Sequence, residues 1–202
     1  MEIACLDLEG VLVPEIWIAF AEKTGIESLR ATTRDIPDYD VLMKGRMKLL
    51  AEHKLGIRDI QEVIGTLRPL EGAKEFLDEL RTLTQVIILS DTFEEFAQPL
   101  MRQLGFPTLF CNQLEIDPAS RIVNYHMRMQ NQKKHSVAAL KSLNFHVLAA
   151  GDAYNDTAML GEAHAGFFFC PPEHLPKEFP QFPVTKTYSE LQMRFAEAGN
   201  LK

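Results

Sequence analysis

Seven side chains that could do chemistry stand at the ends of short apolar runs or at the start of a helical pattern in this chain. In chain order they are Asp7, Glu9, Ser90, Asp91, Lys133, Asp152 and Asp156. Ligand sites in open α/β sheets lie beyond the carboxyl ends of the strands. If the apolar runs are neighbouring strands, one crevice therefore collects several carboxylates, a hydroxyl and an ammonium.

Clustered carboxylates repel one another, so this crevice implies a bound cation. The candidate ligands are all oxygen donors, with no histidine or cysteine at a matching position, which favours Mg²⁺ over zinc. An aspartate beside Mg²⁺ stays ionised and can attack phosphorus to give an aspartyl-phosphate. The metal and a lysine offset charge on the transferring group, and a second carboxyl two residues along can move the proton. The residues thus indicate phosphoryl transfer.

The apolar pattern predicts the elements that would hold these residues in place. Strand-sized apolar runs are expected at 3–6, 86–89, 108–111, 147–150 and 166–170. Helical periodicity lies between them, at 72–82, 93–104, 134–143 and after Asp156. Strands buried on both faces that alternate with helices indicate a parallel sheet in an α/β fold.

Residues 14–68 interrupt this alternation, because they carry helical patterns only, at 14–24, 39–54 and 58–66, with a loop at 32–37. We interpret this segment as a small helical cap inserted after the first strand. The chain would then divide into a catalytic core of 1–13 and 69–202 and a cap of 14–68. Trp17 and Phe20 are expected in the hydrophobic core of the cap.

Two further segments carry strong local signals. Residues 114–127 predict a β-hairpin with its turn at 117–120. Five of the eleven prolines fall in 171–183. This segment is therefore expected to be an extended surface strap, ordered by Phe179 and Phe182 rather than by helix or sheet.

Charge and composition limit the kinds of partner that we expect for this protein. The net charge of −7 disfavours a dedicated nucleic-acid binder. No apolar run approaches the length of about 20 that a membrane span needs, and the N-terminus lacks the pattern of a signal peptide. Cys5, Cys111 and Cys170 lie in apolar runs and are expected as reduced core thiols. We expect a cytoplasmic protein without a nucleic-acid or membrane partner, and a homodimer is left open.

The motifs together resemble those of the haloacid dehalogenase superfamily of phosphotransferases. These motifs are 7–13 (DLEGVLV), Ser90 after a strand, Lys133 opening a helix, and 151–156 (GDAYND). They occur in the expected order, and the resemblance implies a Rossmann-like core with a helical cap after the first strand.

Further features resemble one branch of that superfamily, the phosphoserine phosphatases. They are the segments 43–50 (MKGRMKLL) and 67–73 (LRPLEGA). Glu9 stands where most relatives have a second aspartate, and 90–92 reads Ser-Asp-Thr where many have Ser-Gly-Gly. In both departures the sequence resembles a bacterial bifunctional form that also transfers phosphate to homoserine. This resemblance implies phosphoserine and homoserine as substrates, in serine and threonine biosynthesis.

The resemblance also implies catalytic roles. Asp7 is the nucleophile and a Mg²⁺ ligand. Glu9 is the general acid/base, and its backbone carbonyl is the second ligand. Asp152 is the third ligand, with Asp156 behind it, and Lys133 pairs with Asp7 and the phosphate.

Substrate-binding roles follow in the same way. Ser90 donates to the phosphate, and Asp91 beside it is included among the substrate-binding candidates. Arg46 would bind the substrate carboxylate, because a guanidinium fork matches two carboxylate oxygens. Its alternative is an exposed position on an amphipathic helix. Glu15 would receive the substrate ammonium, and Lys134 is the alternative to its neighbour as the active lysine.

Two other functions are compatible with part of this pattern. The first is a phosphatase for another small phosphomonoester. The second is a phospho-accepting regulatory domain, such as a response-regulator receiver, which also combines an aspartate, a hydroxyl, a lysine and Mg²⁺ at strand ends. In a receiver the nucleophile lies on a middle strand and the acidic pair on the first, whereas here the pair Asp7 and Glu9 opens the chain.

Overall fold

The computed structural model describes residues 1–32, 35–36, 38–199 and 201. The loop expected at 32–37 therefore lies in part outside the described residues. The fold is α/β, with a seven-stranded sheet in the order β4-β3-β2-β1-β5-β6-β7. The strands are β1 (Glu2–Leu6), β2 (Gln85–Phe93), β3 (Thr108–Ile116), β4 (Ile122–His126), β5 (His146–Gly151), β6 (Ala165–Phe169) and β7 (Val184–Thr185).

Strand β1 lies at the centre of the sheet, between β2 and β5, and is parallel to both. Its last residue, Leu6, pairs with Ile88 on one side and Ala150 on the other. The backbone N–H of Asp7 continues this pairing by donating to the carbonyl of Ala150 at 3.0 Å. The carboxyl ends of the three strands therefore meet, as the sequence predicts.

Helices cover both faces of the sheet, and alternate side chains of each central strand enter two separate hydrophobic clusters. Helices α4 (Ala73–Leu83), α5 (Glu94–Gln103) and α9 (Tyr188–Gly199) cover one face. Helices α6 (Gln132–Ser142) and α7 (Thr157–Glu162) cover the other. Helix α9 is an addition to the elements that periodicity predicts. Among the described residues, no helix is both long and apolar enough to span a bilayer.

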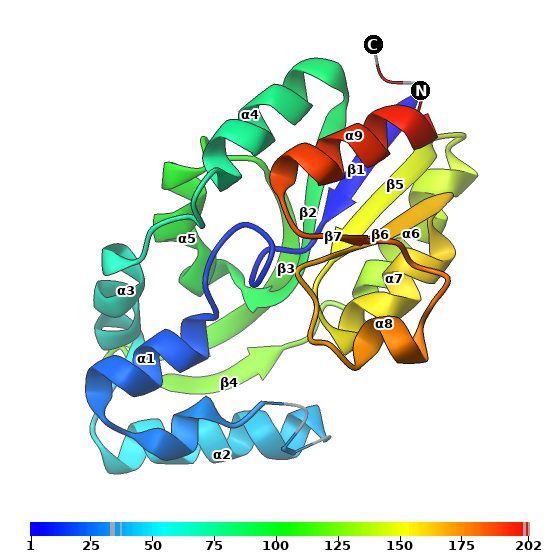
Figure 1. Ribbon diagram of the computed structural model, residues 1–202. Coiled ribbons are helices and arrows are strands. Elements are labelled where there is room, and N and C mark those ends of the chain that lie inside the picture. Colours follow the sequence, from blue (N-terminus) through cyan, green and yellow to red (C-terminus); the bar gives the residue numbers. More distant parts are fainter. Residues whose placement is uncertain (33–34, 37, 200, 202) are drawn as a thin grey trace.

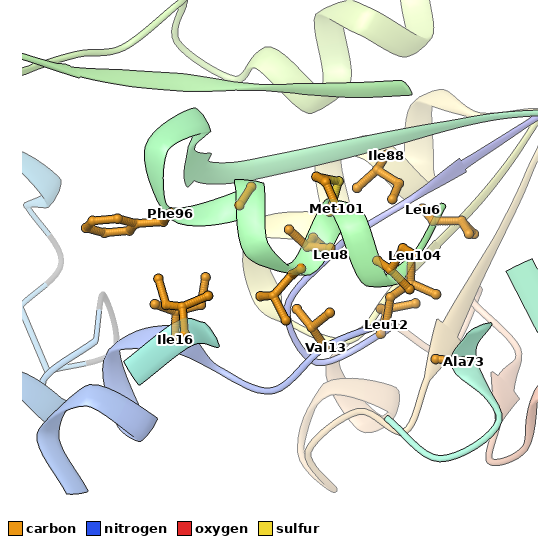
Figure 2. Close-up of a cluster of buried hydrophobic side chains, with 14 of the residues drawn as sticks. Leu6, Leu8, Leu12, Val13, Ile16, Ala73, Ile88, Phe96, Met101 and Leu104 are labelled. Atoms are coloured by element: carbon orange, nitrogen blue, oxygen red, sulfur yellow. The ribbon is translucent and has the colours of Figure 1, made fainter. Parts of the chain in front are cut away.

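The helices between β1 and α4 lie beyond the carboxyl ends of the central strands (Figure 1). They are α1 (Ile16–Thr24), the 3₁₀ turn η1 (Glu27–Arg30), α2 (Tyr39–Glu52) and α3 (Ile57–Thr66). One hydrophobic cluster runs from this segment into the sheet, and Figure 2 shows part of it, including Leu8, Ile16 and Phe96. The division into a core and a cap stays a prediction, because both parts share this cluster.

The predicted β-hairpin is confirmed, since β4 pairs antiparallel with β3. The separate runs at 108–111 and 114–116 form one continuous strand, β3, so the hairpin belongs to the main sheet and that sheet is not wholly parallel. The hairpin also reaches the helical segment. Tyr125 Oη donates to Asp40 Oδ1 of α2 at 2.7 Å, and the N–H of Ile57 in α3 donates to the carbonyl of Ser120 at 2.9 Å.

Two expectations near the C-terminus need correction. The strap 171–183 is not free of helix, since α8 (Leu175–Glu178) forms within it, and a proline fits the first turn of a helix. The aromatic part of the prediction is confirmed: Phe182 is buried and packs edge-on against Phe168, with ring centroids 5.5 Å apart. Cys170 is exposed rather than a core thiol.

Glycine at position 166 of β6 allows α7 to pack closely on the sheet. A Cβ there would lie 2.5 Å from the carbonyl oxygen of Leu160. Gly166→Ala should therefore lower the free energy of unfolding by about 1–3 kcal/mol, measured by urea denaturation. Gly45→Ala is the matched control, since its Cβ would meet nothing within 4 Å in α2, and it should stabilise by about 0.5–1 kcal/mol. Equal effects at the two sites would contradict this packing argument.

Candidate active site

A buried ammonium lies between two buried carboxylates at the carboxyl end of β1. Lys133 Nζ, in the first turn of α6, is 2.7 Å from Asp7 Oδ1 and 2.7 Å from Asp156 Oδ1. Burial alone would lower the pKa of Lys133, but the charges of Asp156 and Asp7 raise it well above its usual value. The ammonium therefore stays protonated. Lys134 is exposed, so the structure places Lys133 and not its neighbour beside Asp7.

Asp156 holds the loop after β5 in place. Its Oδ1 accepts from Lys133, and its Oδ2 accepts from the backbone N–H groups of Asp152 at 3.0 Å and Ala153 at 3.1 Å. Gly151 makes room for this arrangement, because a Cβ there would lie 2.4 Å from the Asp156 side chain. Since both of its oxygens are engaged, Asp156 is suited to position other groups.

Asp7, Asp152 and Asp156 form an acidic cluster with the spacing of a cation site. One carboxylate oxygen from each lies within 4.8 Å of the others. Burial first, then the charge of Asp156, raises the pKa of Asp152 to about 7. The pKa of Asp7 is also well above its usual range, through burial and Asp156, with Lys133 opposing. A bound cation would keep both carboxylates ionised, and the oxygen donors fit Mg²⁺.

The loop after β1 is shaped by the same cluster. Gly10 adopts φ of +79°, a conformation that favours glycine. A Cβ on Gly10 would lie 2.3 Å from Asp152 Oδ2. The glycine of the first motif therefore allows the backbone to approach the carboxylate of the last motif.

Glu9 occupies a different position from the acidic cluster. Its Oε2 accepts from the backbone N–H of Ile16 at 2.8 Å, at the start of α1. Burial first, then the charge of Glu15, raises the pKa of Glu9 to about 7, while the bonds from Ile16 and Thr92 oppose the shift. A carboxyl that titrates near neutrality can both donate and accept a proton at physiological pH.

All nine expected catalytic and substrate-binding residues have a defined place, and eight of them line one cavity of about 420 Å³. The lining ones are Asp7, Glu9, Glu15, Arg46, Ser90, Asp91, Lys133 and Asp152. Asp156 lies behind them, wholly buried. Arg46 is only 7% exposed, so the interpretation as an exposed helix position is wrong. Glu15 is exposed at the cavity.

The residues around Ser90 and Asp91 include several that the sequence analysis missed. Gln132 Nε2 donates to the carbonyl of Ser90, and Asn112 Nδ2 donates to that of Asp91 at 3.1 Å. Asn155 Nδ2 donates to Asp91 Oδ2 at 3.0 Å. The side chain of Asp91 thus links the end of β2 to the loop after β5.

Signals for some of these residues exist in the sequence. Asn155 lies inside the last motif, and Gln132 precedes the motif lysine. Asn112 directly follows the strand predicted at 108–111, and its polar side chain is fully buried. A buried amide in a strand indicates a specific hydrogen-bond partner. Nothing local marks Tyr39 or His174, which also line the cavity.

Fold and site together define a phosphotransferase-type hydrolase. A family model described as haloacid dehalogenase-like hydrolase matches residues 1–164, and the chain belongs to this family. The chain is 66% identical to the phosphoserine phosphatase ThrH of Pseudomonas aeruginosa, over 99% of this chain and 98% of the relative. It is 65% identical to a phosphoserine phosphatase of Pseudomonas syringae pv. tomato, over 99% of this chain and 84% of the relative.

Solved structures support the fold. A substrate-bound phosphoserine phosphatase complex superposes with a TM-score of 0.78 at 21% identity, covering 96% of this chain and 97% of the other. A phospho-aspartyl intermediate analogue of phosphoserine phosphatase also gives 0.78, at 20% identity, covering 96% and 98%. At these identities the likeness concerns the fold alone.

The acidic cluster gives a test that does not depend on turnover. Asp152→Asn should weaken Mg²⁺ binding at least about tenfold, because it removes one anionic oxygen from the cluster. Isothermal titration calorimetry with MgCl₂ measures this directly. Asp78→Asn, an exposed aspartate of α4, is the control and should bind Mg²⁺ as the wild type does. Unchanged Mg²⁺ affinity in Asp152→Asn would place the cation elsewhere.

Proposed function

We propose that this protein is a Mg²⁺-dependent phosphoserine phosphatase that works through an aspartyl-phosphate on Asp7. The observation that carries this proposal is a single cavity lined both by the acidic cluster with Lys133 and by Arg46 and Glu15. The first set suits a phosphoryl group, and the second suits the carboxylate and ammonium of an amino acid. The names of the two Pseudomonas relatives support the same substrate.

Asp7 is proposed as the nucleophile. Its Oδ1 accepts from Lys133 and from the N–H of Leu8 at 2.7 Å, so the carboxylate is held in one orientation. A carboxylate oxygen attacks phosphorus as the bond to the serine oxygen breaks, and Glu9 gives that oxygen its proton. A water then attacks phosphorus, Glu9 takes its proton, and Asp7 and phosphate are released.

Mg²⁺ would be held by the Asp7 and Asp152 carboxylates and the backbone carbonyl of Glu9, and when bound it offsets the negative charge of the phosphoryl group. Lys133 contributes a second positive charge, and Ser90 donates to a phosphate oxygen. Both residues are buried and line the cavity. Electrostatic stabilisation of this kind is the main contribution of proteins to phosphoryl transfer.

Substrate recognition is proposed to depend on Arg46 and Glu15. Arg46 Nε is buried and lacks a hydrogen-bond partner among the described residues. A buried guanidinium N–H without a partner is costly, and a substrate carboxylate would satisfy it. Glu15 would receive the ammonium, and Asp91, which accepts a hydrogen bond from Asn155, would order that side chain near the phosphate end of the substrate.

The same site is proposed to transfer phosphate to homoserine. Homoserine carries the same carboxylate and ammonium as serine, with its hydroxyl one methylene further out. Bound in place of serine, it would present this hydroxyl instead of water, and Glu9 would remove its proton. Glu9 in place of aspartate and the Ser-Asp-Thr sequence at 90–92 motivate this part of the proposal.

Of the two alternative functions, one is set aside and the other is open to experiment. The regulatory-domain interpretation is set aside, because the chain belongs to a hydrolase family. The alternative that the enzyme is a phosphatase for another phosphomonoester needs an experiment. In a phosphate-release screen over small phosphomonoesters, with and without Mg²⁺, phosphoserine should give the highest kcat/KM.

Replacement of the nucleophile is the direct test of the covalent mechanism. Asp7→Asn keeps the shape of the side chain and removes its anionic oxygen. Phosphoserine turnover should fall by about three orders of magnitude or more. Phosphate release measures turnover, and circular dichroism confirms that the variant is folded. A folded Asp7→Asn protein that retains about a tenth of the wild-type rate would exclude Asp7 as nucleophile.

The transferase activity has its own test. Millimolar homoserine, added to enzyme, Mg²⁺ and phosphoserine, should divert phosphate into phosphohomoserine with ping-pong kinetics, as a covalent intermediate requires. Phosphorus NMR follows both products over time. Glu9→Gln should depress both outcomes. Release of inorganic phosphate alone, at a rate that homoserine does not change, would remove transfer from the proposal.

A further inference from the structure

Trp17 is the single tryptophan of the chain, and it belongs both to the hydrophobic core and to the cavity. The sequence predicts that Trp17 lies in the hydrophobic core, which is confirmed, but it does not predict that Trp17 also lines the cavity. Its ring packs edge-on against Phe20 of α1, at 6.3 Å between centroids, and against Phe96 of α5, at 5.5 Å. The guanidinium carbon of Arg46 lies 4.4 Å from the centroid of the same ring. The indole therefore connects the packed core to the proposed carboxylate anchor.

The direct contacts of Arg46 are with neutral groups. One terminal nitrogen donates to the carbonyl of Ala31 at 2.8 Å, and the other approaches Met43 Sδ at 3.8 Å. No ion pair of Arg46 occurs among the residues that the structure describes. The indole face is thus the aromatic surface against which the guanidinium lies, through the attraction of a cation to the π system, while the charges of Glu9 and Glu15 stabilise Arg46 from beyond ion-pair distance.

We propose that Trp17 is a positioning residue for substrate selection, because its indole face holds the Arg46 guanidinium with Nε left to receive the carboxylate of the substrate. This inference rests on the proposed function, since it assumes an amino-acid phosphoester. The ring and the Ala31 carbonyl hold the guanidinium in position before substrate arrives. Preorganisation of this kind lowers the entropy that binding must overcome.

The position of Trp17 in α1 gives a way to separate this role from general support of the fold. The preceding residue, Ile16, donates its N–H to Glu9. A substitution that displaced α1 would disturb Glu9 and lower kcat on every phosphoester. A substitution that released only Arg46 would raise KM for substrates with a carboxylate. The comparison of two substrates therefore distinguishes the two effects.

The experiment uses phosphoserine and p-nitrophenyl phosphate, which lacks a carboxylate. Trp17→Leu keeps an apolar side chain without a π face. It should lower the ratio of kcat/KM for phosphoserine to that for p-nitrophenyl phosphate by roughly 3- to 30-fold, mainly through KM. Trp17→Phe keeps an aromatic face and should restore most of the ratio. Phe20→Leu, in the same helix and away from Arg46, should lower the melting temperature without changing the ratio.

Fluorescence adds a readout that needs no catalysis. Because Trp17 is the only tryptophan, the emission comes from this one indole and reports on changes in its surroundings, Arg46 among them. Titration with L-serine should give a saturable change in emission in the wild type, and Arg46→Met should abolish it. Absence of that change in the wild type would overturn the inference.

The kinetic outcomes separate the inference from the function on which it rests. Equal losses on both substrates in Trp17→Leu, or no loss on either, overturn the positioning role while the phosphatase proposal stands. Wild-type enzyme without phosphoserine turnover overturns the proposed function, and the inference with it.

Discussion

The ammonium of Lys133, buried between Asp7 and Asp156, is the interaction on which the rest of the site depends. It joins the end of β1, the start of α6 and the turn after β5, three segments that are far apart in the chain. Removal of the ammonium would leave the buried carboxylates of Asp7 and Asp156 without the cation between them, which is strongly destabilising in protein interiors. The central position of β1 brings these segments together, since both of its neighbours run parallel to it.

The cavity that contains this interaction carries an excess of negative charge. Carboxylates outnumber the two cations, Lys133 and Arg46, along its lining. A cation among Asp7 and Asp152 would correct the excess where phosphate binds. Arg46 lies apart from that cluster, stacked on an aromatic ring. The two cations thus suit two different anionic groups of one substrate.

Local sequence patterns predict the buried strands and the motif residues, because each depends on a short run of side chains. They do not predict contacts between distant segments. The hydrogen bond from the Gln132 amide to the Ser90 carbonyl, the position of Arg46 over the Trp17 ring and the continuity of β3 from the sheet into the hairpin all arise from the tertiary fold. Helix α8 is not predicted, because a proline-rich segment indicates extended structure. Pro176 falls in the first turn of this helix, where proline is tolerated.

The hydrophobic cluster shared by α1, α3, α5 and the sheet also limits how enzymes of this kind can diverge. Exchange of residues 14–68 as a module would leave Phe96 of α5 without Trp17, one of its aromatic neighbours. Each incoming segment would need matching changes in the residues of α5 and the sheet that pack against it. New substrate ranges are therefore more accessible through single substitutions along the cavity than through recombination of the whole segment.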